Sequence, residues 1–254
     1  MSAFWTVRRG DIVVPTLTWP PLIWTRFVER PNRFLVHAEM DGGELAVTHL
    51  ADPGRLEELL VPGARVAITP AVGEKRKTEF SVVLVDAGSS LVSLHTGVPN
   101  RLARDAFERG AIPEFAHLAT VRREVTVGKS RFDFEMSNEG ADRCLVEVKS
   151  ASLVENGIAL FPDAVTARGK RHVEELTALK LDGVRTAVLA VIQRSDAHAF
   201  AADGSRDPKF SAALENAKES GVEVLAMRCE VTEEGISLTD RVPVWSGWPP
   251  SPPK

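Results

Sequence analysis

Two short segments could bring together two carboxylates and a lysine, the groups that metal-assisted hydrolysis of a phosphodiester requires. Segments 131–135 and 145–149 each have the composition of a β-strand. Because side chains alternate between the faces of a strand, Glu147 and Lys149 project together, and Asp133 projects from the first segment. If the strands pair, Asp133 and Glu147 could hold Mg²⁺ or Mn²⁺, with water in its remaining positions. The lysine could then orient the nucleophile and offset charge in the transition state.

The same alternation predicts that Phe132 and Phe134 share the core-facing side of their strand. A Glu-x-Lys triplet is a weak signal by itself, because it is expected about once by chance in a chain of this length. The charged side chains could equally lie on the solvated face of an antiparallel sheet and pair across strands. Both interpretations stay open from the two strands alone.

A predicted helix over residues 163–180 adds candidate phosphate contacts. At 3.6 residues per turn, His172 lies within an apolar stripe and Arg168 lies beside it, so both could reach a phosphate near the carboxylates. Alternatively, His172 is a histidine at the edge of the core and Arg168 pairs with a carboxylate of the sheet. The stripe, which should face the sheet, consists of Val165, Gly169, Leu176 and Leu179.

The composition is that of an ordinary soluble globular protein. Hydrophobic residues make up 44% of the chain and charged residues 26%, which predicts a buried core. The net charge of −4 argues against a wholly electrostatic nucleic-acid binder but allows local basic patches. Cys144 and Cys229 lack metal-ligand spacing and are predicted to be buried and reduced. With no signal-peptide pattern and no long apolar run, we expect a cytoplasmic protein that does not enter membranes.

The predicted elements divide the chain into two domains. Residues 1–21 are an extension. Residues 22–96 are short strands with one short helix at 55–60, which suits a small closed barrel of the OB type or an SH3-like barrel. Residues 97–245 mix helices and strands, as in an α/β (α+β) sandwich. Residues 246–254 form a Pro-rich tail that we expect to be flexible.

A basic loop in the first domain is a second candidate for contact with nucleic acid. Lys75-Arg76-Lys77 is the densest basic run in the chain, and a basic loop beside the strands of an OB-like barrel suits a phosphate backbone. An ordinary solvated hairpin tip is equally compatible with this run. Since tyrosine is absent, base stacking would depend on four aromatic residues, all of which we expect in the core: Trp24, Phe27, Phe34 and Phe80.

Several runs of the chain resemble the sugar fermentation stimulation (SfsA) family. The most specific run is FPDAVTARGKRH, residues 161–172, and both SRFDF at 130–134 and VEVKS at 146–150 are also similar. Further similar positions are Arg30–Leu35, Asn100–Leu102 and Gly221–Ala226. The resemblance covers about residues 22–245, which is nearly the whole chain.

The resemblance implies an N-terminal OB-like β-barrel followed by a PD-(D/E)xK nuclease-like mixed-sheet domain. Asp133, Glu147 and Lys149 then fall on the PD-(D/E)xK positions, and Glu108 is a candidate for a further acid from the preceding helix. The family also implies sequence-independent binding of DNA, with RNA not excluded, and an oligomer is compatible with the sequence. A Mg²⁺-dependent nuclease is therefore expected, and the alternative is a non-catalytic regulator of sugar (maltose) metabolism genes.

One motif departs from the family pattern. Where the family commonly has His-Cys-Pro-Asn-Thr-Gly, residues 49–54 of this chain read His-Leu-Ala-Asp-Pro-Gly. Asp52 stands in place of the asparagine and Pro53 in place of the hydroxyl residue, so a hydrogen-bonding role does not carry over to these two positions from the resemblance. Asp-Pro-Gly is also favourable turn chemistry. Arg55 adds a further candidate phosphate contact. The residues expected to contact nucleic acid are Arg33, His49, Arg55, Lys75, Arg76, Lys77, Arg101, Arg168 and His172.

Overall fold

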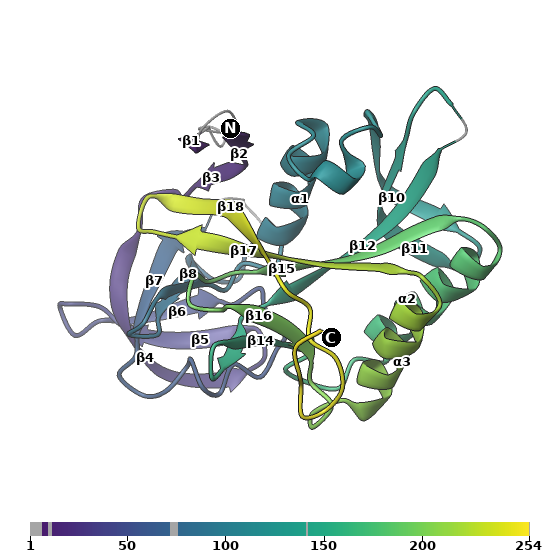
Figure 1. Ribbon diagram of the computed structural model, residues 1–254. Helices are drawn as coiled ribbons and strands as arrows, with labels where there is room; N and C mark the ends of the chain where they lie inside the picture. Colours follow the sequence, from purple (N-terminus) through teal and green to yellow (C-terminus); the bar gives the residue numbers. More distant parts are fainter. Residues whose placement is uncertain (1–6, 10–11, 72–75, 141, 254) are drawn as a thin grey trace.

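The first domain is a small closed barrel. The computed structural model describes residues 7–9, 12–71, 76–140 and 142–253. The strands of the barrel are β4 (Ile23–Asn32), β5 (Leu35–Glu39), β6 (Leu45–His49), β7 (Arg65–Pro70), β8 (Phe80–Asp86) and β9 (Leu91–Ser93). They pair in the order β6-β5-β4-β7-β8-β9, and a parallel contact between β6 and β8 closes the barrel (Figure 1). The architecture agrees with the predicted OB-like fold.

The alternation of residue types along β5 and β6 explains their placement. Val36 and Ala38 of β5 are buried inside the barrel, whereas the residues between and beside them are partly or fully exposed. The two strands are joined by a turn in which Gly43 has a φ of +80°, a conformation that glycine adopts without strain. One face of this pair of strands therefore fills the barrel and the other is open to solvent.

The predicted helix at 55–60 is wrong. Only a single turn forms there, in which the N–H groups of Leu59 and Leu60 donate to the carbonyl oxygen of Leu56. Leu56 itself has a φ of +53°, outside the right-handed helical region, so a helix cannot run through it. The leucines are nevertheless buried in the core of the barrel.

The second domain is built on a seven-stranded mixed sheet with the order β10-β11-β12-β15-β17-β18-β3. The central strands β12, β15 and β17 are parallel and the others are antiparallel to their neighbours. The strands are β10 (Thr120–Val127), β11 (Ser130–Ser137), β12 (Arg143–Ala151), β15 (Arg185–Ile192), β17 (Glu223–Val231), β18 (Gly235–Val242) and β3 (Thr16–Thr18). A small sheet beside it, which the sequence did not predict, comprises β13 (Leu153–Glu155), β14 (Ile158–Phe161) and β16 (Ala199–Ala202).

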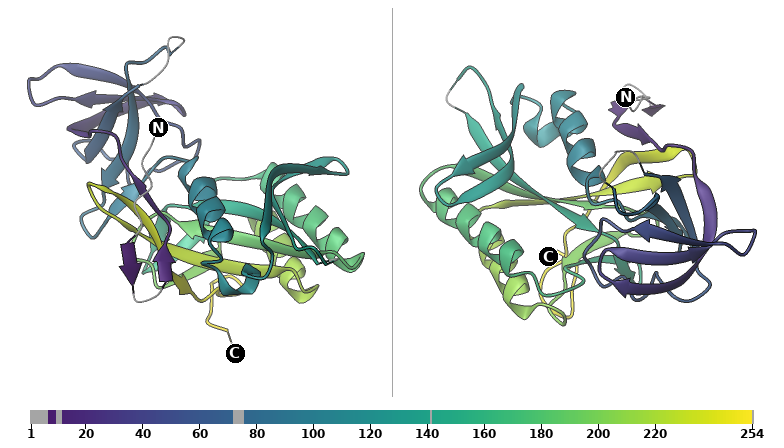
Figure 2. Two further views of the ribbon diagram at one scale, coloured as in Figure 1. Left: turned by 90° about the horizontal axis from the view of Figure 1, so that it is seen from above. Right: turned by 180° about the vertical axis from the view of Figure 1, so that it is seen from behind.

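Helices cover both faces of the large sheet. Helix α1 (Val98–Glu108) packs on one face, and α2 (Ala167–Leu181) and α3 (Pro208–Glu219) lie side by side on the other (Figures 1 and 2). A single-turn 3₁₀ helix, η1 (Pro113–Phe115), follows α1. The apolar residues of β12 and β15 alternate between two core clusters, one on each side, which explains why these strands read as continuous apolar runs.

Described segments near both ends of the chain pack on the second domain. In the predicted extension, β1 (Val7–Arg9) pairs with β2 (Ile12–Val14), and β3 then pairs with β18 at the edge of the large sheet. Within the predicted Pro-rich tail, residues 246–251 form a turn. Two backbone hydrogen bonds of 3.0 Å join Ser246 and Ser251, and Trp248 packs against Gly204, where an added Cβ would lie 2.7 Å from the Cβ of the tryptophan.

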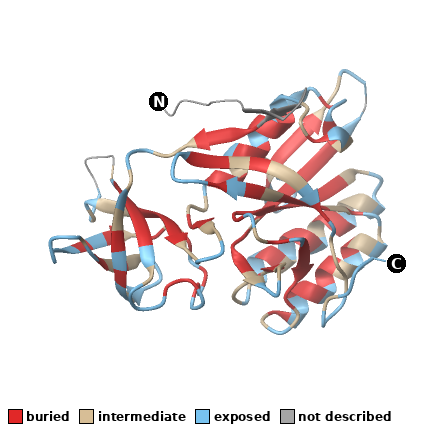
Figure 3. Cartoon of the chain, turned by 60° about the vertical axis from the view of Figure 1, so that its left-hand side comes forward, coloured by how far each residue is buried: buried red, intermediate tan, exposed pale blue. Residues whose placement is uncertain are grey.

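The two domains share one core at their junction. Val83 and Leu84 of the barrel belong to the same buried cluster as Leu102 of α1. Both the barrel and the second domain contain buried strands (Figure 3). The Ser93 N–H donates to the carbonyl oxygen of Gln193 at 3.0 Å, and the Ser93 hydroxyl donates to the side-chain oxygen of Gln193 at 2.9 Å. Because apolar packing and buried hydrogen bonds cross the junction, the barrel is fixed relative to the sheet that carries the site.

Two simpler expectations concern burial. Cys144 and Cys229 are free and buried, as predicted. Burial raises the pKa of the Cys144 thiol to about 12, so this side chain stays protonated and unreactive at neutral pH. None of the helices among the described residues is long and apolar enough to cross a membrane.

Candidate active site

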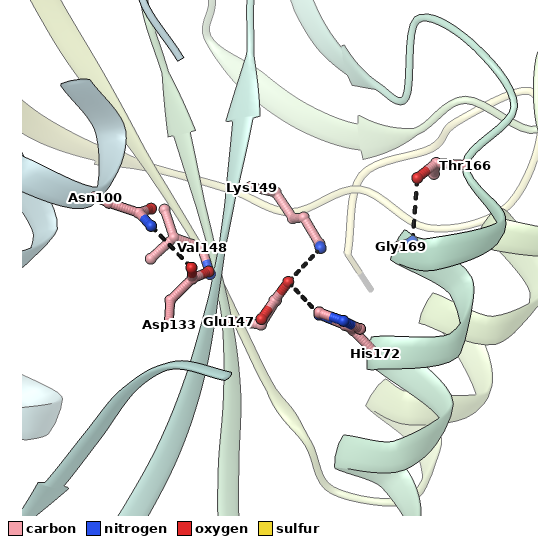
Figure 4. Close-up of polar contacts among 8 residues, drawn as sticks. All are labelled: Asn100, Asp133, Glu147, Val148, Lys149, Thr166, Gly169 and His172. Atoms are coloured by element: carbon pink, nitrogen blue, oxygen red, sulfur yellow. Dashed lines mark hydrogen bonds and ion pairs between the residues drawn. The ribbon is translucent and has the colours of Figure 1, made fainter. Parts of the chain in front are cut away.

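The site begins where strands β11 and β12 separate. The two strands pair from Phe134, opposite Val146, towards the far end of the sheet. Before that point the side chain of Asp133 takes the place of the neighbouring strand, because its Oδ2 accepts the N–H of Val148 at 2.8 Å. Its Oδ1 accepts a hydrogen bond of 2.8 Å from the side-chain amide of Asn100, near the start of α1. Asp133 is therefore held between α1 and the sheet (Figure 4).

Glu147 and Lys149 project from β12 towards α2, on the face opposite the valines between and beside them. The Lys149 ammonium donates to Glu147 Oε1 at 2.8 Å, and His172 of α2 lies 2.6 Å from the same oxygen through Nδ1 (Figure 4). Because an ionised carboxylate only accepts hydrogen bonds, Nδ1 of His172 carries the proton in this contact. All three side chains are buried.

The two carboxylates influence each other. Burial raises the pKa of Asp133, and the nearby charge of Glu147 raises it further. The hydrogen bonds from Val148 and Asn100 act in the opposite direction, since they stabilise the ionised form. The second oxygen of Glu147, Oε2, is buried and has no hydrogen-bond partner among the described residues. These features are those of a site that binds a cation, because a positive charge would relieve both the repulsion and the unpaired oxygen.

An open cleft of about 230 Å³ gives access to these groups. Its lining residues come from β11, β12 and the first turns of α1 and α2, so that the site lies where several elements begin or separate. The residues that line it include Thr96, Asn100, Asp133, Glu147, Lys149, Ser150, Thr166 and Arg168. Thr166 caps α2, its hydroxyl accepting the N–H of Gly169 at 3.1 Å, and thereby fixes the position at which the helix starts.

The side chains of strand β11 do not alternate regularly between the two faces of the sheet. Phe134 packs in the core beneath α1, whereas Phe132 belongs to the other core cluster and meets the ring of His172 edge-on, with the ring centroids 6.0 Å apart. The prediction that the two rings share a face is therefore wrong. The reason is local: the Asp133 side chain replaces a backbone partner, so the strand departs from regular pairing at that residue.

The predicted helix over 163–180 begins later than expected. Helix α2 starts at Ala167, so Val165 lies outside it and is 72% exposed instead of facing the sheet. Leu176 and His172 are buried as the periodicity predicted. Gly169 is also buried, and an added Cβ would lie 2.8 Å from the side chain of Thr166. This glycine therefore makes room for the helix cap.

The structure does not bring Glu108 to the cleft. Glu108 lies at the end of α1, eight residues beyond Asn100 and so about 12 Å further along the helix. Its carboxylate pairs with Arg104 at 2.6 Å on the surface. Asn100 is the residue of α1 that reaches the site. In the sequence, Asn100 stands out only as part of a run similar to the family, because an asparagine near a helix start more often caps the helix or lies in a turn.

The residues expected to contact nucleic acid fall into two groups. Arg168 lines the cleft and His172 is buried behind it, in contact with Glu147. The others lie in the barrel or at its junction with the second domain. Arg33 and Arg55 line one further cleft, Arg76 and Arg101 line another, His49 is half-buried and Lys77 is exposed, while Lys75 lies outside the described residues.

Comparison with known proteins divides the chain at the same place. The model of the sugar fermentation stimulation protein RE domain matches residues 97–235, and that of the SfsA N-terminal OB domain matches residues 28–94. A sugar fermentation stimulation protein homolog from Chloroflexus aurantiacus is 47% identical over 240 residues, which cover 94% of this chain and 92% of the relative. A homolog from Chloroflexus aggregans is 49% identical over 232 residues, covering 91% and 88%.

A solved structure is similar to this chain in its fold. Pyrococcus furiosus SfsA, solved in complex with Ca²⁺, superposes with a TM-score of 0.82 at 28% sequence identity. The similarity covers 89% of this chain and 97% of that chain. It therefore includes both the barrel and the mixed-sheet domain.

Proposed function

This chain belongs to the sugar fermentation stimulation (SfsA) family, with an OB domain followed by a restriction-endonuclease-like domain, and from that premise we propose that it binds DNA and hydrolyses phosphodiester bonds with a divalent cation. One observation carries the proposal. Glu147 Oε2 is buried and unpaired among the described residues, in a site whose second carboxylate, Asp133, has a raised pKa. A buried anionic oxygen is costly to leave without a partner, and a cation supplies one.

Asp133 and Glu147 are the residues that would hold the cation. Among the described residues, no group of three or more His, Cys, Asp or Glu side chains is arranged to bind a metal. Two carboxylates suit Mg²⁺ or Mn²⁺, because Mg²⁺ usually keeps several waters and shares its remaining positions with phosphate oxygens. The Ca²⁺ in the Pyrococcus furiosus structure supports a hard divalent ion in this family. When bound, such an ion acidifies water and neutralises the scissile phosphate.

The protein side chains position the reacting groups. Lys149 holds its ammonium against Glu147 at the wall of the cleft, where it can orient a water molecule and offset charge that develops on the phosphate. His172 donates to the same Glu147 oxygen, and the hydrogen bonds from Lys149 and His172 together hold that carboxylate in one orientation. Asn100 orients Asp133 in the same way from α1.

The candidate contacts favour phosphates over base edges. Arg33, Arg55 and Arg168 line open clefts, and exposed arginines beside an acidic site suit a backbone whose charge they neutralise. Binding should therefore be independent of sequence and should weaken as salt is raised, because each contact releases counterions. RNA offers the same phosphates and belongs in the test.

The test is cleavage of labelled single- and double-stranded DNA and RNA with Mg²⁺, Mn²⁺ or chelator. Wild type should cleave at least one substrate only with metal, and Asp133→Ala or Lys149→Ala should lower the rate by more than about 100-fold. Asp142→Ala, which removes an exposed acid next to β12, is the matched control and should cleave normally.

Absence of metal-dependent cleavage on every substrate would reject the hydrolytic function. If binding persisted, a non-catalytic regulator acting on sugar metabolism genes would be favoured instead. Binding that did not weaken with salt would also reject the phosphate contacts themselves.

A further inference from the structure

We infer that Phe34 and His49 form a stacking platform for an unpaired base, so that the substrates of the cleft are nucleic acids with a single-stranded segment. The inference rests on the proposed function, since it names the substrate class of the same site. It starts from an aromatic ring that the sequence placed in the core. Phe34 is instead 50% exposed.

The ring lies on a fixed backbone. The Phe34 N–H donates to Asn32 Oδ1 at 2.9 Å, and its carbonyl oxygen accepts the N–H of Leu50 at 3.0 Å. The imidazole of His49, on the adjacent strand β6, stacks on the phenyl ring with an interplanar angle of 19° and a centroid distance of 6.3 Å. The other aromatic candidates differ, because Phe27 is buried and both Trp24 and Phe80 are partly buried against core clusters.

The platform lies on the face that OB folds use for oligonucleotides. Strands β5 and β6 are the second and third strands of the barrel, and their outer face is the usual binding face of this fold. Val47 of β6 is also exposed there, next to the ring pair on the same face of the strand, so the apolar surface continues from the ring pair to this residue. An unpaired base stacks on such a surface, whereas a base in a duplex has its faces covered by its neighbours.

Charge differs between the two ends of this face. The hairpin end carries three exposed acids, Glu39, Asp41 and Glu44. The end with the ring pair carries cations. Arg33 precedes Phe34, and burial lowers the pKa of His95, which the nearby charges of Arg101 and Arg76 lower further. A phosphate backbone is attracted to this end and repelled from the other.

A continuous series of clefts leads from this end to the carboxylates. Arg33 and Gly54 line both the cleft that contains Arg55 and a second cleft between the domains. The second cleft in turn shares Thr96, Ser150 and Thr166 with the active-site cleft.

The size of these clefts also favours a single strand. Their volumes are about 380, 280 and 230 Å³ in order towards the carboxylates. These values lie near or below the lower end of pockets that hold one drug-sized ligand. A single strand can follow these connected clefts while one of its bases stacks on Phe34, which adjoins Arg33 at their outer end.

The experiment measures binding of fluorescein-labelled DNA by anisotropy, with chelator present so that no strand is cut. Phe34→Ala should weaken binding of a 12-nucleotide single strand by about 5- to 150-fold, the range for loss of one stacked base. Binding of the matching duplex should change less than about 2-fold, and Phe34→Trp should restore the single-strand affinity. Leu45→Ala, which removes an equally exposed apolar side chain at the acidic end of the same face, should leave both affinities unchanged.

A strand with abasic sites at every position tests the wild-type chain without any substitution. Wild type should bind the abasic strand as weakly as Phe34→Ala binds the normal strand. Phe34→Ala should bind the abasic strand no more weakly than wild type does. An unchanged single-strand affinity in Phe34→Ala, or an equal loss for single strand, duplex and abasic strand, would overturn the platform. Cleavage assays in Mg²⁺ run in parallel separate this failure from that of the proposed function, since cleavage depends on Asp133 and binding in chelator does not.

Discussion

The two domains hold their charged residues in opposite ways. In the sheet domain, Glu147, Lys149 and His172 are 5%, 8% and 3% exposed, and both Lys149 and His172 contact Glu147. In the barrel, Arg33 and Arg55 are exposed and open onto clefts. Buried charges depend on their partners, so losing one should have a large effect on stability and activity. Exposed charges act nearly independently and are screened by salt, so each should contribute little.

Among the substitutions that test this comparison, Lys149→Met should have the largest effect on stability. The substitution leaves the Glu147 carboxylate buried with one partner fewer, which should lower the free energy of unfolding by about 3–5 kcal/mol. Urea denaturation measures it. The matched control is Lys170→Met on α2, whose pair with Glu174 is solvent-accessible and should be worth less than about 0.5 kcal/mol. Similar losses in both variants would contradict the distinction between the buried and the exposed charges.

Asp52 is the exception that sharpens the comparison, because it is a charge buried in the barrel. Its pKa is raised from 3.8 to about 6, chiefly by burial; the nearby Asp163 also raises it, whereas the Gly54 N–H and Arg30 lower it. The folded state therefore binds the proton more tightly than the unfolded state. The resulting stability is fully present below about pH 4 and is lost as pH rises through 6, by about 3 kcal/mol in total.

Asp52→Asn should remove this pH dependence. Wild type and variant should have the same stability at pH 4, and the variant should be more stable by up to about 3 kcal/mol at pH 7. The amide oxygen can still accept the Gly54 N–H that Asp52 Oδ1 accepts at 2.8 Å. Denaturation at a series of pH values measures the difference. A variant that became less stable than wild type as pH rose would show the opposite sign and reject the assignment.

Much of the site could be predicted because its signals are local. Period-two alternation placed Glu147 and Lys149 on one face of a strand, and helical periodicity placed His172 towards them, as the contacts at Glu147 Oε1 confirm. The two domains were predicted from the order of the elements and from the runs that resemble the family. These features depend on spacing along one strand or one helix, which the sequence contains directly.

The remaining features of the fold and the site depend on contacts between segments that are distant in the sequence. Nothing near Asn100 in the sequence indicates that its amide meets Asp133, and nothing near Thr16 indicates that it joins the sheet edge at Ser237. Phe34 was assigned to the core by residue type, yet it lies in the turn just before β5 and is 50% exposed, with only the ring of His49 stacked on it among the aromatic contacts of the described residues. Tertiary packing decides such positions, and a single sequence does not encode it in any local pattern.

Gly54→Ala tests how tightly the two domains are joined. Gly54 belongs to the barrel, and an added Cβ would lie 2.1 Å from Oδ2 of Asp163 in the second domain. We expect a loss at the lower end of about 1–3 kcal/mol, because the Asp163 side chain can rotate away. Gly42→Ala is the control, since no atom lies within 4 Å of its added Cβ. Equal thermal stability of the two variants would show that this contact does not hold the domains together.

Arg33→Ala and Arg55→Ala should give the smallest effects and test whether the exposed charges act independently. Each substitution should reduce the slope of log K against log salt by about 0.7 for a single strand. The double variant should show the sum, because the guanidinium groups share no partner among the described residues. The folded state should be unaffected, since the contact of Arg33 with Arg30 uses only its backbone carbonyl oxygen. Lys209→Ala on α3 should leave the slope unchanged. A double variant that lost all binding would show that the barrel, like the sheet domain, uses its charges as a coupled unit.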